Sequence, residues 1–529
     1  MSISGDWDRR ISRRTLLRTG GTLAAGVVLA PTIARATSSS SVDGNPFSLG
    51  VASGDPTPDG VVLWTRLAPQ PELALGGMRP ERCAVQYEVA LDEQFKFPVR
   101  KGVEYAVPEW AHSVHVEVAG LLPAREYFYR FKWGTNVSPV GRTRTAPPPL
   151  HANRELTFAF VSCHNWANGY FNVYDDIVRR DPQFVVHLGD YIYEGPGGTA
   201  PFRPHLPAVR LASLSDFRIR HAQYKTDPDL QKVHAALPFF MTWDDHEVDN
   251  NYAGLVSGTG EVPPEQFPAV RAAAYKAYYE HMPLRKTAVP SAGTGMMMFR
   301  TIQWGRLASF YAIDGRQYRS PNADPTSPRG ANGYTPSELD PNRTMLGAEQ
   351  MSWLLNELST TKAGWNILAN NKAFSPFDRD TALNSVEFNS PDNWDGYVAD
   401  RQKILATLAE RRTPNPIVIT GDSHNNWVRN VPPDFNRLDG APVATEFMGT
   451  SLSTAGNTPN PFVRWNNDAN NPHLLFRNNQ RGYVECSMTP QSWTSRFRIV
   501  TEVEKRVYGT ATTLATFGVE SGKAGAIRM

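Results

Sequence analysis

Polar side chains in this sequence follow apolar runs, at the points where buried strands would end. Cys163 ends a run that begins at Leu156, and Asp190 ends a run that begins at Phe184. Later apolar runs are followed by residues of the types that bind metals or move protons, namely Asp244, Asp245, His246, Asn370, Asn371, Asp422 and His424. Ligands bind outside the carboxyl ends of strands in open α/β sheets, so we expect these side chains to form one cluster.

The elements that would position this cluster are strands that alternate with helices. The apolar runs have the length of buried strands, and helical spacing predicts helices over residues 269–279, 348–358 and 398–408. This alternation predicts a layered α/β domain over residues 154–507. For residues 508–529 the pattern leaves two alternatives open, a loose tail and a helical segment that caps the site.

A different pattern precedes the α/β domain. Residues 45–145 form short alternating segments broken by Gly, Pro and Asp, which is typical of the strands of a β-sandwich. Gly120-Leu121-Leu122-Pro123 and the following Tyr127 resemble the fibronectin type III signature, in which a tyrosine anchors a corner between strands. We therefore expect a small all-β, fibronectin III-like sandwich, joined to the next domain by a stiff polyproline linker at 146–149.

The first 36 residues have the pattern of a twin-arginine signal peptide. Arg13 and Arg14 precede an apolar run that ends near Ala30, and Ala34-Arg35-Ala36 is a typical cleavage pattern. The apolar run is shorter than the roughly 20 residues of a membrane span, so we expect no transmembrane anchor. The pattern predicts export by the twin-arginine machinery to the periplasm or the cell exterior.

Composition limits the classes of partner. The leader contains six arginines and two aspartates, so its removal leaves 48 basic and 50 acidic residues. A balance of about −2 gives no basis for a nucleic-acid site, which needs a clustered basic surface. Three cysteines cannot form a dense disulfide framework, and we expect Cys83 and Cys486 to be buried apolar side chains. We also expect the protein to be a monomer.

Three blocks resemble those of the calcineurin-like metallophosphoesterase superfamily. Gly189-Asp190 and Gly421-Asp422-Ser423-His424 are similar to its Gly-Asp and Gly-His-x-His blocks, and residues 244–247 are similar to its Gly-Asn-His-Glu block. The spacing of Asp190 and Tyr193 is similar to that of purple acid phosphatases, whose tyrosine binds a ferric ion. The resemblance implies a layered β-sandwich flanked by helices.

Departures from the superfamily pattern resemble one of its branches. Cys163 stands where an aspartate is expected, Asp245 replaces an asparagine, and Asp422 replaces a histidine. Together with the strings Ser-Leu-Gly-Val-Ala-Ser-Gly-Asp-Pro at 48–56 and Val-Leu-Trp-Thr-Arg at 62–66, they resemble the PhoD-type alkaline phosphatases, which include phospholipase D-like members. This resemblance covers nearly the whole chain after the leader. It implies Fe³⁺ and Ca²⁺ as cofactors, and phosphomonoesters and phosphodiesters as substrates.

The donor types agree with those two ions. Thiolate from Cys163, carboxylate from Asp190, phenolate from Tyr193 and imidazole from His424 would give Fe³⁺ several anionic donors. A neighbouring site would share Asp190 and offer only oxygen, which suits Ca²⁺. Its further ligands would be Asp245, Asp422 and the Asn371 carbonyl oxygen.

The expected mechanism needs no protein nucleophile. Two metals about 3.5 to 4 Å apart would lower the pKa of a bound water and neutralise the phosphoryl oxygens, so that hydroxide attacks phosphorus. Asp190 would bridge the metals, and His246 would donate a proton to the leaving alkoxide or bind the phosphate. The alternative for His246 is a structural residue held by Glu247 or by a loop backbone.

Two other functions stay open from the sequence. A phospholipase D or cell-wall phosphodiesterase on the same fold would act mainly on diesters. A non-catalytic surface-binding protein would use its sandwich to bind a polymer and its metals for structure.

Overall fold

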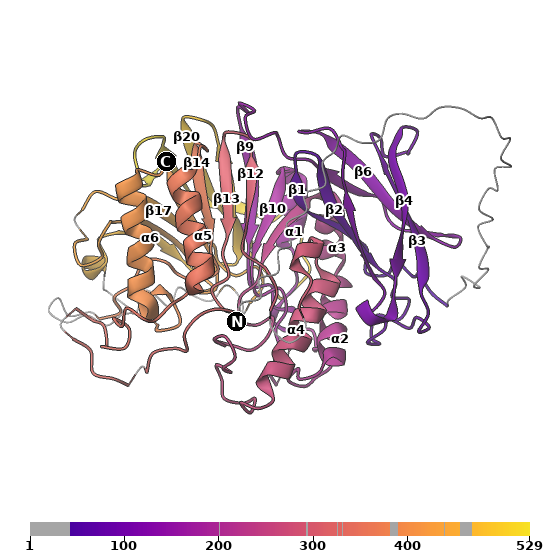
Figure 1. The fold of residues 1–529 in the computed structure, drawn as a ribbon, viewed down its shortest axis with the longest axis horizontal. Helices are drawn as coiled ribbons and strands as arrows, with labels where there is room; N and C mark the ends of the chain where they lie inside the picture. Colours follow the sequence, from indigo (N-terminus) through magenta and orange to yellow (C-terminus); the bar gives the residue numbers. More distant parts are fainter. Residues whose placement is uncertain are drawn as a thin grey trace, which may run out of the picture. The chain divides into compact units, whose positions relative to one another are not determined.

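The computed structural model describes residues 43–529 except 200, 292–294, 325, 331, 381–389, 439, 455–456 and 458–467. The expected leader at 1–36 lies outside the described residues. Three sheets and six α-helices are found among the described residues, in a mixed α/β fold (Figure 1). None of the helices that the structure describes has the length and hydropathy to cross a bilayer.

The largest sheet has ten strands, with the order β22-β21-β20-β19-β9-β10-β11-β1-β2-β5. Its parallel centre consists of β9 (Leu156–Val161), β10 (Phe184–Leu188) and β11 (Pro238–Thr242). Every residue of β10 and β11 is buried, as expected for parallel strands covered on both faces. The outer strands are β1 (Val51–Thr57), β2 (Gly60–Arg66), β5 (Ser113–Val118), β19 (Gly482–Met488), β20 (Ser492–Ile499), β21 (Thr512–Glu520) and β22 (Ile527–Arg528).

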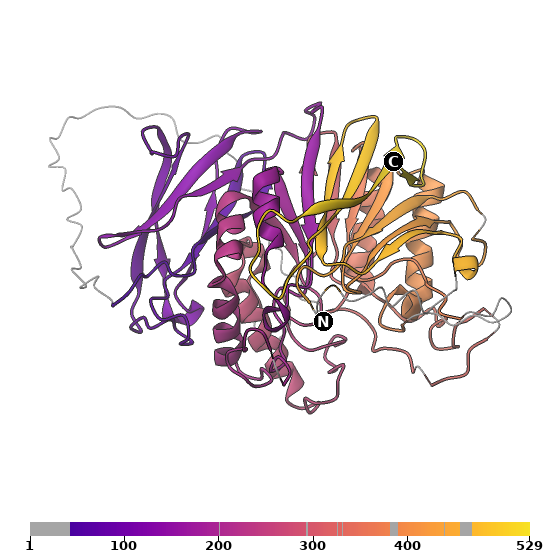
Figure 2. The same cartoon turned by 180° about the vertical axis from the view of Figure 1, so that it is seen from behind.

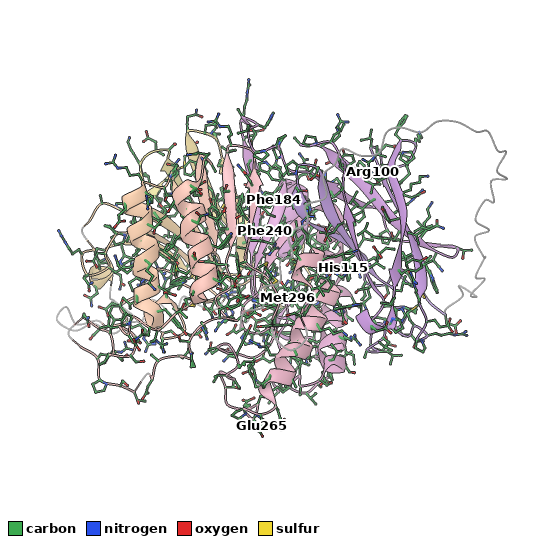
Figure 3. The ribbon with its side chains drawn as sticks, viewed as in Figure 1. Arg100, His115, Phe184, Phe240, Glu265 and Met296 are labelled. Carbon is green, nitrogen blue, oxygen red and sulfur yellow. The ribbon has the colours of Figure 1, made fainter. Side chains whose placement is uncertain are left out.

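A seven-stranded sheet packs against the ten-stranded sheet. Its order is β12-β13-β14-β15-β17-β16-β18. Phe184 and Phe240 of the larger sheet, which are labelled in Figure 3, share one apolar core with Phe310, Ile367 and Ile417 of the smaller sheet. The strands are β12 (Arg300–Trp304), β13 (Ala308–Ala312), β14 (Trp365–Ala369), β15 (Pro416–Thr420), β16 (Asn426–Val431), β17 (Ala444–Met448) and β18 (Leu474–Asn478).

Helices cover the two outer faces of this pair of sheets. The ten-stranded sheet shares a core with α1 (Val173–Arg180), α2 (Leu214–Lys225), α3 (Pro228–Ala236) and α4 (Phe267–His281), and the seven-stranded sheet with α5 (Gly347–Thr360) and α6 (Val398–Arg411). The three predicted helices are confirmed within α4, α5 and α6. Short 3₁₀ turns are η1 (Pro108–Trp110), η2 (Trp166–Asn168), η3 (Lys286–Ala288), η4 (Trp394–Tyr397) and η6 (Asp468–Asn470).

Helices α1 to α3 were not expected from periodicity, but local signals begin two of them. The Ser213 hydroxyl accepts a hydrogen bond from the Asp216 amide, and the Asp216 carboxylate accepts one from the Ser213 amide, which is a capping box for α2. Asp227 caps α3, which has a proline at its first position.

The strands of the expected N-terminal sandwich are divided between two sheets. A five-stranded sheet contains β3 (Cys83–Ala90), β4 (Pro98–Ala106), β6 (Glu126–Trp133), β7 (Asn136–Val137) and β8 (Gly141–Arg144). In contrast, β1, β2 and β5 belong to the ten-stranded sheet, because β1 pairs in parallel with β11. The Tyr127 hydroxyl accepts a hydrogen bond from the Leu122 amide at 2.8 Å, which is the corner contact that the sequence suggested. The boundaries at 45–145 and 154–507 stay predictions.

The expectation of a tail or a helical cap after residue 507 is wrong. Residues 512–520 form β21, which pairs with β20 along its length (yellow in Figure 2). Its residues alternate, and Ala515, Phe517 and Val519 enter the core between the sheets.

Candidate metal centre

The candidate ligands lie on sharp turns directly after the strands. Cys163 follows β9, Asp190 follows β10, and Asp422 and His424 follow β15. All four have left-handed backbones, with φ angles of 61°, 55°, 64° and 54°. Such conformations are unfavourable for residues with a side chain and cluster at functional sites. Gly189 allows this close packing, because a Cβ atom there would lie 2.4 Å from the Asp244 nitrogen.

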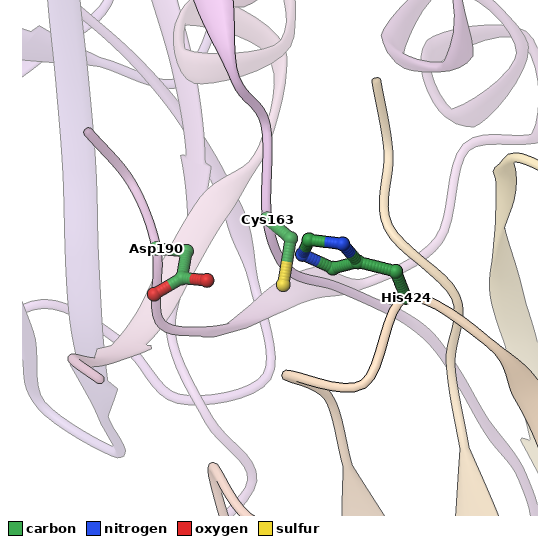
Figure 4. A group of neighbouring side chains, drawn as sticks. All are labelled: Cys163, Asp190 and His424. Atoms are coloured by element: carbon green, nitrogen blue, oxygen red, sulfur yellow. The ribbon is translucent and has the colours of Figure 1, made fainter. Parts of the chain in front are cut away.

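Four of the predicted ligands meet in one group, the cysteine cluster of Cys163, Asp190, Tyr193 and His424. The candidate ligand atoms of Cys163, Asp190 and His424 lie within 4.8 Å of one another (Figure 4). The Tyr193 hydroxyl lies 3.1 Å from Asp190 Oδ2 and 3.4 Å from His424 Nε2. All four donors of the predicted ferric site are therefore together.

Next to it lies an aspartate cluster of Asp244, Asp245 and Asp422, whose carboxylate oxygens also lie within 4.8 Å of one another. Asp190 and Asp245 form a third such group with His246. Because Asp190 belongs to the cysteine cluster and Asp245 to the aspartate cluster, this group connects the two. Asp244 is an addition to the predicted ligand set. Asp244 lies just beyond the end of β11, and this position after a strand is the signal that also placed Asp245.

Asn371 reaches the aspartate cluster with its amide. Its Nδ2 donates hydrogen bonds to Asp244 Oδ1 and to the Trp243 carbonyl, both at 3.0 Å. Among the described residues, Asn371 Oδ1 and Asp190 Oδ1 are buried without a hydrogen-bond partner. Buried oxygen atoms without a donor are uncommon and fit the approach of a cation. The donors present therefore fit two neighbouring metal sites. The cysteine cluster offers sulfur, nitrogen and oxygen atoms, and the aspartate cluster with Asn371 offers only oxygen atoms.

Two buried cations that sequence reasoning missed hold the aspartate cluster. Arg316 donates from Nε to Asp244 at 2.6 Å and from Nη2 reaches Asp245 at 2.9 Å. Lys372 Nζ lies 2.7 Å from Asp422 Oδ1 and 3.2 Å from Asp244 Oδ2. Asp392, at 2.8 Å from both cations, joins the network. Lys372 directly follows Asn371 at the end of β14, which is the signal that could have found it.

Burial makes the ionised ligands costly in the absence of a cation. Burial raises the pKa of Cys163, and the neighbouring Asp190 raises it further. Burial also raises the pKa of Asp190. The pKa of Tyr193 is raised by burial and by the neighbouring Asp190. Burial and Asp245 raise the pKa of Asp422 to about 8. Ligands of this kind lose their protons when a cation binds, so cation binding and ionisation are coupled.

His246 is held by Glu194. Its Nδ1 lies 2.7 Å from Glu194 Oε2, and the Glu194 side chain is buried. Burial would lower the pKa of His246, but Glu194 and Asp245 outweigh it and raise the pKa well above its usual value. Because Nδ1 is committed to Glu194, Nε2 is the nitrogen that can donate a proton to a ligand.

Glu247 has a different partner from the one proposed in the alternative for His246. Its carboxylate accepts hydrogen bonds from the Tyr191 amide at 2.6 Å and from the Asp244 amide at 2.9 Å. It therefore joins the loop of Asp190 to the loop of Asp244 and Asp245. The alternative in which Glu247 holds His246 is wrong.

Comparison with known proteins gives one consistent family. The family model described as PhoD-like phosphatase matches residues 158–497, and the model described as its N-terminal domain matches residues 33–147. Alkaline phosphatase D of Bacillus subtilis (strain 168) is 43% identical over 502 residues, which cover 92% of this chain and 84% of that protein. A solved structure of PhoD has a TM-score of 0.87 and 41% identity, and the match covers 92% of this chain and 93% of that chain.

Proposed function

Because this chain belongs to the PhoD-like phosphatase family and is a phosphatase, we propose that it is an exported alkaline phosphatase that hydrolyses phosphomonoesters and phosphodiesters. The observation that carries this proposal is the convergence of Cys163, Asp190 and His424, whose ligand atoms lie within 4.8 Å of one another. The twin-arginine pattern before residue 36 supports export. The helices outside two packed sheets support a calcineurin-like fold, and the Tyr127 corner supports a fibronectin III-like N-terminal domain.

The cysteine cluster would hold Fe³⁺. Asp190, Asp245, Asp422 and Asn371 would hold Ca²⁺, and Asp244 is close enough to take part. When bound, these cations supply the positive charge that activates water and neutralises phosphoryl oxygens.

The protein's own groups orient the reactants and move the proton. His246 donates a proton from Nε2 to the leaving oxygen, and Glu194 fixes its tautomer through Nδ1. Arg316 and Lys372 keep the aspartate cluster in place and balance part of its charge. Glu247 fixes the distance between the two ligand loops through its two backbone contacts.

Removal of the metals is the first test of this proposal. We expect about one iron per chain by elemental analysis and a violet or brown colour from charge transfer to Fe³⁺. A calcium chelator should lower the activity at least tenfold, because the cations supply several kcal/mol of transition-state stabilisation. Added Ca²⁺ should restore the activity. Fully active protein that is colourless and free of iron would contradict the proposed metal set.

Turnover of different substrates separates the proposed function from its closest alternative. Nitrophenyl phosphate, bis(nitrophenyl) phosphate and phosphatidylcholine vesicles test monoesterase, diesterase and phospholipase activity in the same metal-loaded preparation. Turnover of both nitrophenyl esters supports the proposal. Turnover restricted to the vesicles would favour the phospholipase, and hydrolysis of none would leave a binding protein.

The variant Glu194→Gln tests the proton donor. We expect it to lower kcat for an alkyl phosphate by roughly 10²-fold, because general acid catalysis contributes about 10² to 10⁴. Nitrophenyl phosphate should be affected less, since nitrophenolate leaves without a proton. Glu520→Gln is the matched control, because Glu520 is exposed at the end of β21 and its ion pair is with Lys523. Equal losses for both substrates would argue against proton donation by His246.

A further inference from the structure

A loop that is rich in hydroxyl side chains follows β17 and donates hydrogen bonds to the backbone of the cysteine cluster. We call it the hydroxyl loop, residues 449–454, with the sequence Gly-Thr-Ser-Leu-Ser-Thr. Thr454 Oγ1 and Ser451 Oγ donate hydrogen bonds to the Cys163 carbonyl at 2.8 Å and 3.0 Å. Thr450 Oγ1 donates to the His424 carbonyl at 3.0 Å. The loop therefore contacts the backbones of two predicted ligands that come from different sheets.

Those two carbonyls belong to residues with unfavourable backbones. Cys163 and His424 have φ angles of 61° and 54°, which are left-handed values. Their turns also bury polar backbone atoms, which must find partners. The hydroxyl loop supplies these partners, so it helps to stabilise the turns from which the Sγ and imidazole donors project.

Thr454 also touches a third donor. Its Oγ1 lies 3.3 Å from the Tyr193 hydroxyl, while its proton is directed to the Cys163 carbonyl. The Tyr193 proton is directed to Asp190 Oδ2 at 3.1 Å, and once Tyr193 is ionised only Thr454 can donate in this contact. Thr454 would then donate to the phenolate oxygen, while Ser451 Oγ keeps its bond to the Cys163 carbonyl. One hydroxyl group thus contacts both the Cys163 turn and the Tyr193 phenol.

A buried arginine fixes the loop in turn. Arg481 donates from Nη1 to the Thr454 carbonyl at 3.1 Å and from Nη2 to the His424 carbonyl at 2.9 Å. The Thr454 amide donates to Ser451 Oγ at 2.7 Å. Thr454 is itself buried, so water does not compete strongly for these bonds.

We propose that Thr454 is a positioning residue for the iron of this phosphatase, and that it acts by holding the Cys163 turn and the Tyr193 phenol in a shared arrangement. The inference rests on the proposed function, because it requires iron in the cysteine cluster. Groups that orient metal ligands in this way typically change metal affinity by 10- to 100-fold when they are replaced.

Thr454→Val and Thr454→Ser test this role in the full-length enzyme. Valine keeps the shape and removes the hydroxyl, and serine restores it. Thr413→Val is the matched control, because the Thr413 hydroxyl is also buried and donates a hydrogen bond to the Leu358 carbonyl at 3.0 Å. Thr413 lies just before β15 begins, whereas Asp422 and His424 follow the end of that strand. The measurements are retained iron against increasing concentrations of an iron chelator, the visible charge-transfer band, and the melting temperature.

We expect Thr454→Val to lose iron at a roughly tenfold lower chelator concentration and to shift the visible band, with Thr454→Ser close to wild type. Thr413→Val should keep the wild-type iron retention and band even if its melting temperature falls as far. A Thr454→Val enzyme with wild-type retention and band would overturn the inference. Wild-type protein without iron would instead overturn the proposed metal set.

Discussion

Replacement of Asp190 by asparagine is expected to lower kcat/KM for nitrophenyl phosphate by about 10³-fold or more. Asp190 contributes to both the cysteine cluster and the group with Asp245 and His246, so one substitution affects both predicted metal sites. The loss of several kcal/mol of electrostatic stabilisation corresponds to that factor. Asparagine tolerates the left-handed backbone of this position and has almost the same shape, so the charge is the main change.

Steady-state kinetics and elemental analysis of the same preparation check this expectation. Asp181→Asn is the matched control, because Asp181 also has a left-handed backbone, with φ of 51°, and is exposed at the end of α1. The control should keep wild-type activity and metal content. An Asp190→Asn enzyme with full metal content and near-normal turnover would exclude Asp190 as the shared ligand.

The second large effect concerns stability and involves a buried lysine. Lys225 ends α2 with its side chain in the core, where Nζ lies 3.3 Å from His234 Nε2 and 4.6 Å from the centre of the Trp64 ring. Burial lowers the pKa of Lys225 well below its usual value. We expect Lys225→Met to raise the free energy of unfolding at pH 7 by up to about 4 kcal/mol, because methionine need not lose a proton to be buried.

The sign of this effect depends on pH. A basic group whose pKa is lower in the folded protein than in the unfolded chain binds more protons in the unfolded chain. The folded protein therefore loses stability as the pH falls below the pKa that the group has in the unfolded chain. The advantage of Lys225→Met should therefore be larger at pH 7 than at pH 9 and disappear toward about pH 10. Chemical unfolding at pH 7, 9 and 10 measures it, with the half-exposed Lys403→Met as control. A constant difference across this range would contradict a neutral Lys225.

Buried histidines near Lys225 also make the folded state less stable as the pH falls, but at a lower pH than Lys225 does. Burial lowers the pKa of His221, His234 and His281 well below the usual value. Both ring nitrogens of His221 are buried without a hydrogen-bond partner among the described residues. These three histidines therefore make the folded state lose stability as the pH falls below about 6.5.

The sequence predicted the strand ends well, because parallel strands covered on both faces need continuous apolar runs. β10 and β15 are examples, and the side chains that follow them are those placed at the site. Helix α2 could not be predicted from periodicity, since its buried face includes Arg218, Arg220 and His221. Strand β21 did have an alternating pattern, with Phe517 and Val519 buried, but its partner β20 is apparent only in the folded chain.

The supporting residues of the site were harder to predict than its ligands. Ligand types follow from donor chemistry, whereas Arg316 and Lys372 are ordinary charged residues until the fold buries them beside Asp244. Glu194 was missed for the same reason. Its neighbour Tyr193 fits a known ligand spacing, but its contact with His246 joins residues that are 52 positions apart.

The sheet order has a consequence for biosynthesis. Strand β9, which precedes Cys163, takes its second neighbour from β19, and the turn at Cys163 takes partners from residues 451 and 454. These segments leave the ribosome hundreds of residues after Cys163 itself. A nascent chain therefore cannot complete the proposed metal pocket during most of its translation, and we expect the metal to enter only a nearly finished polypeptide.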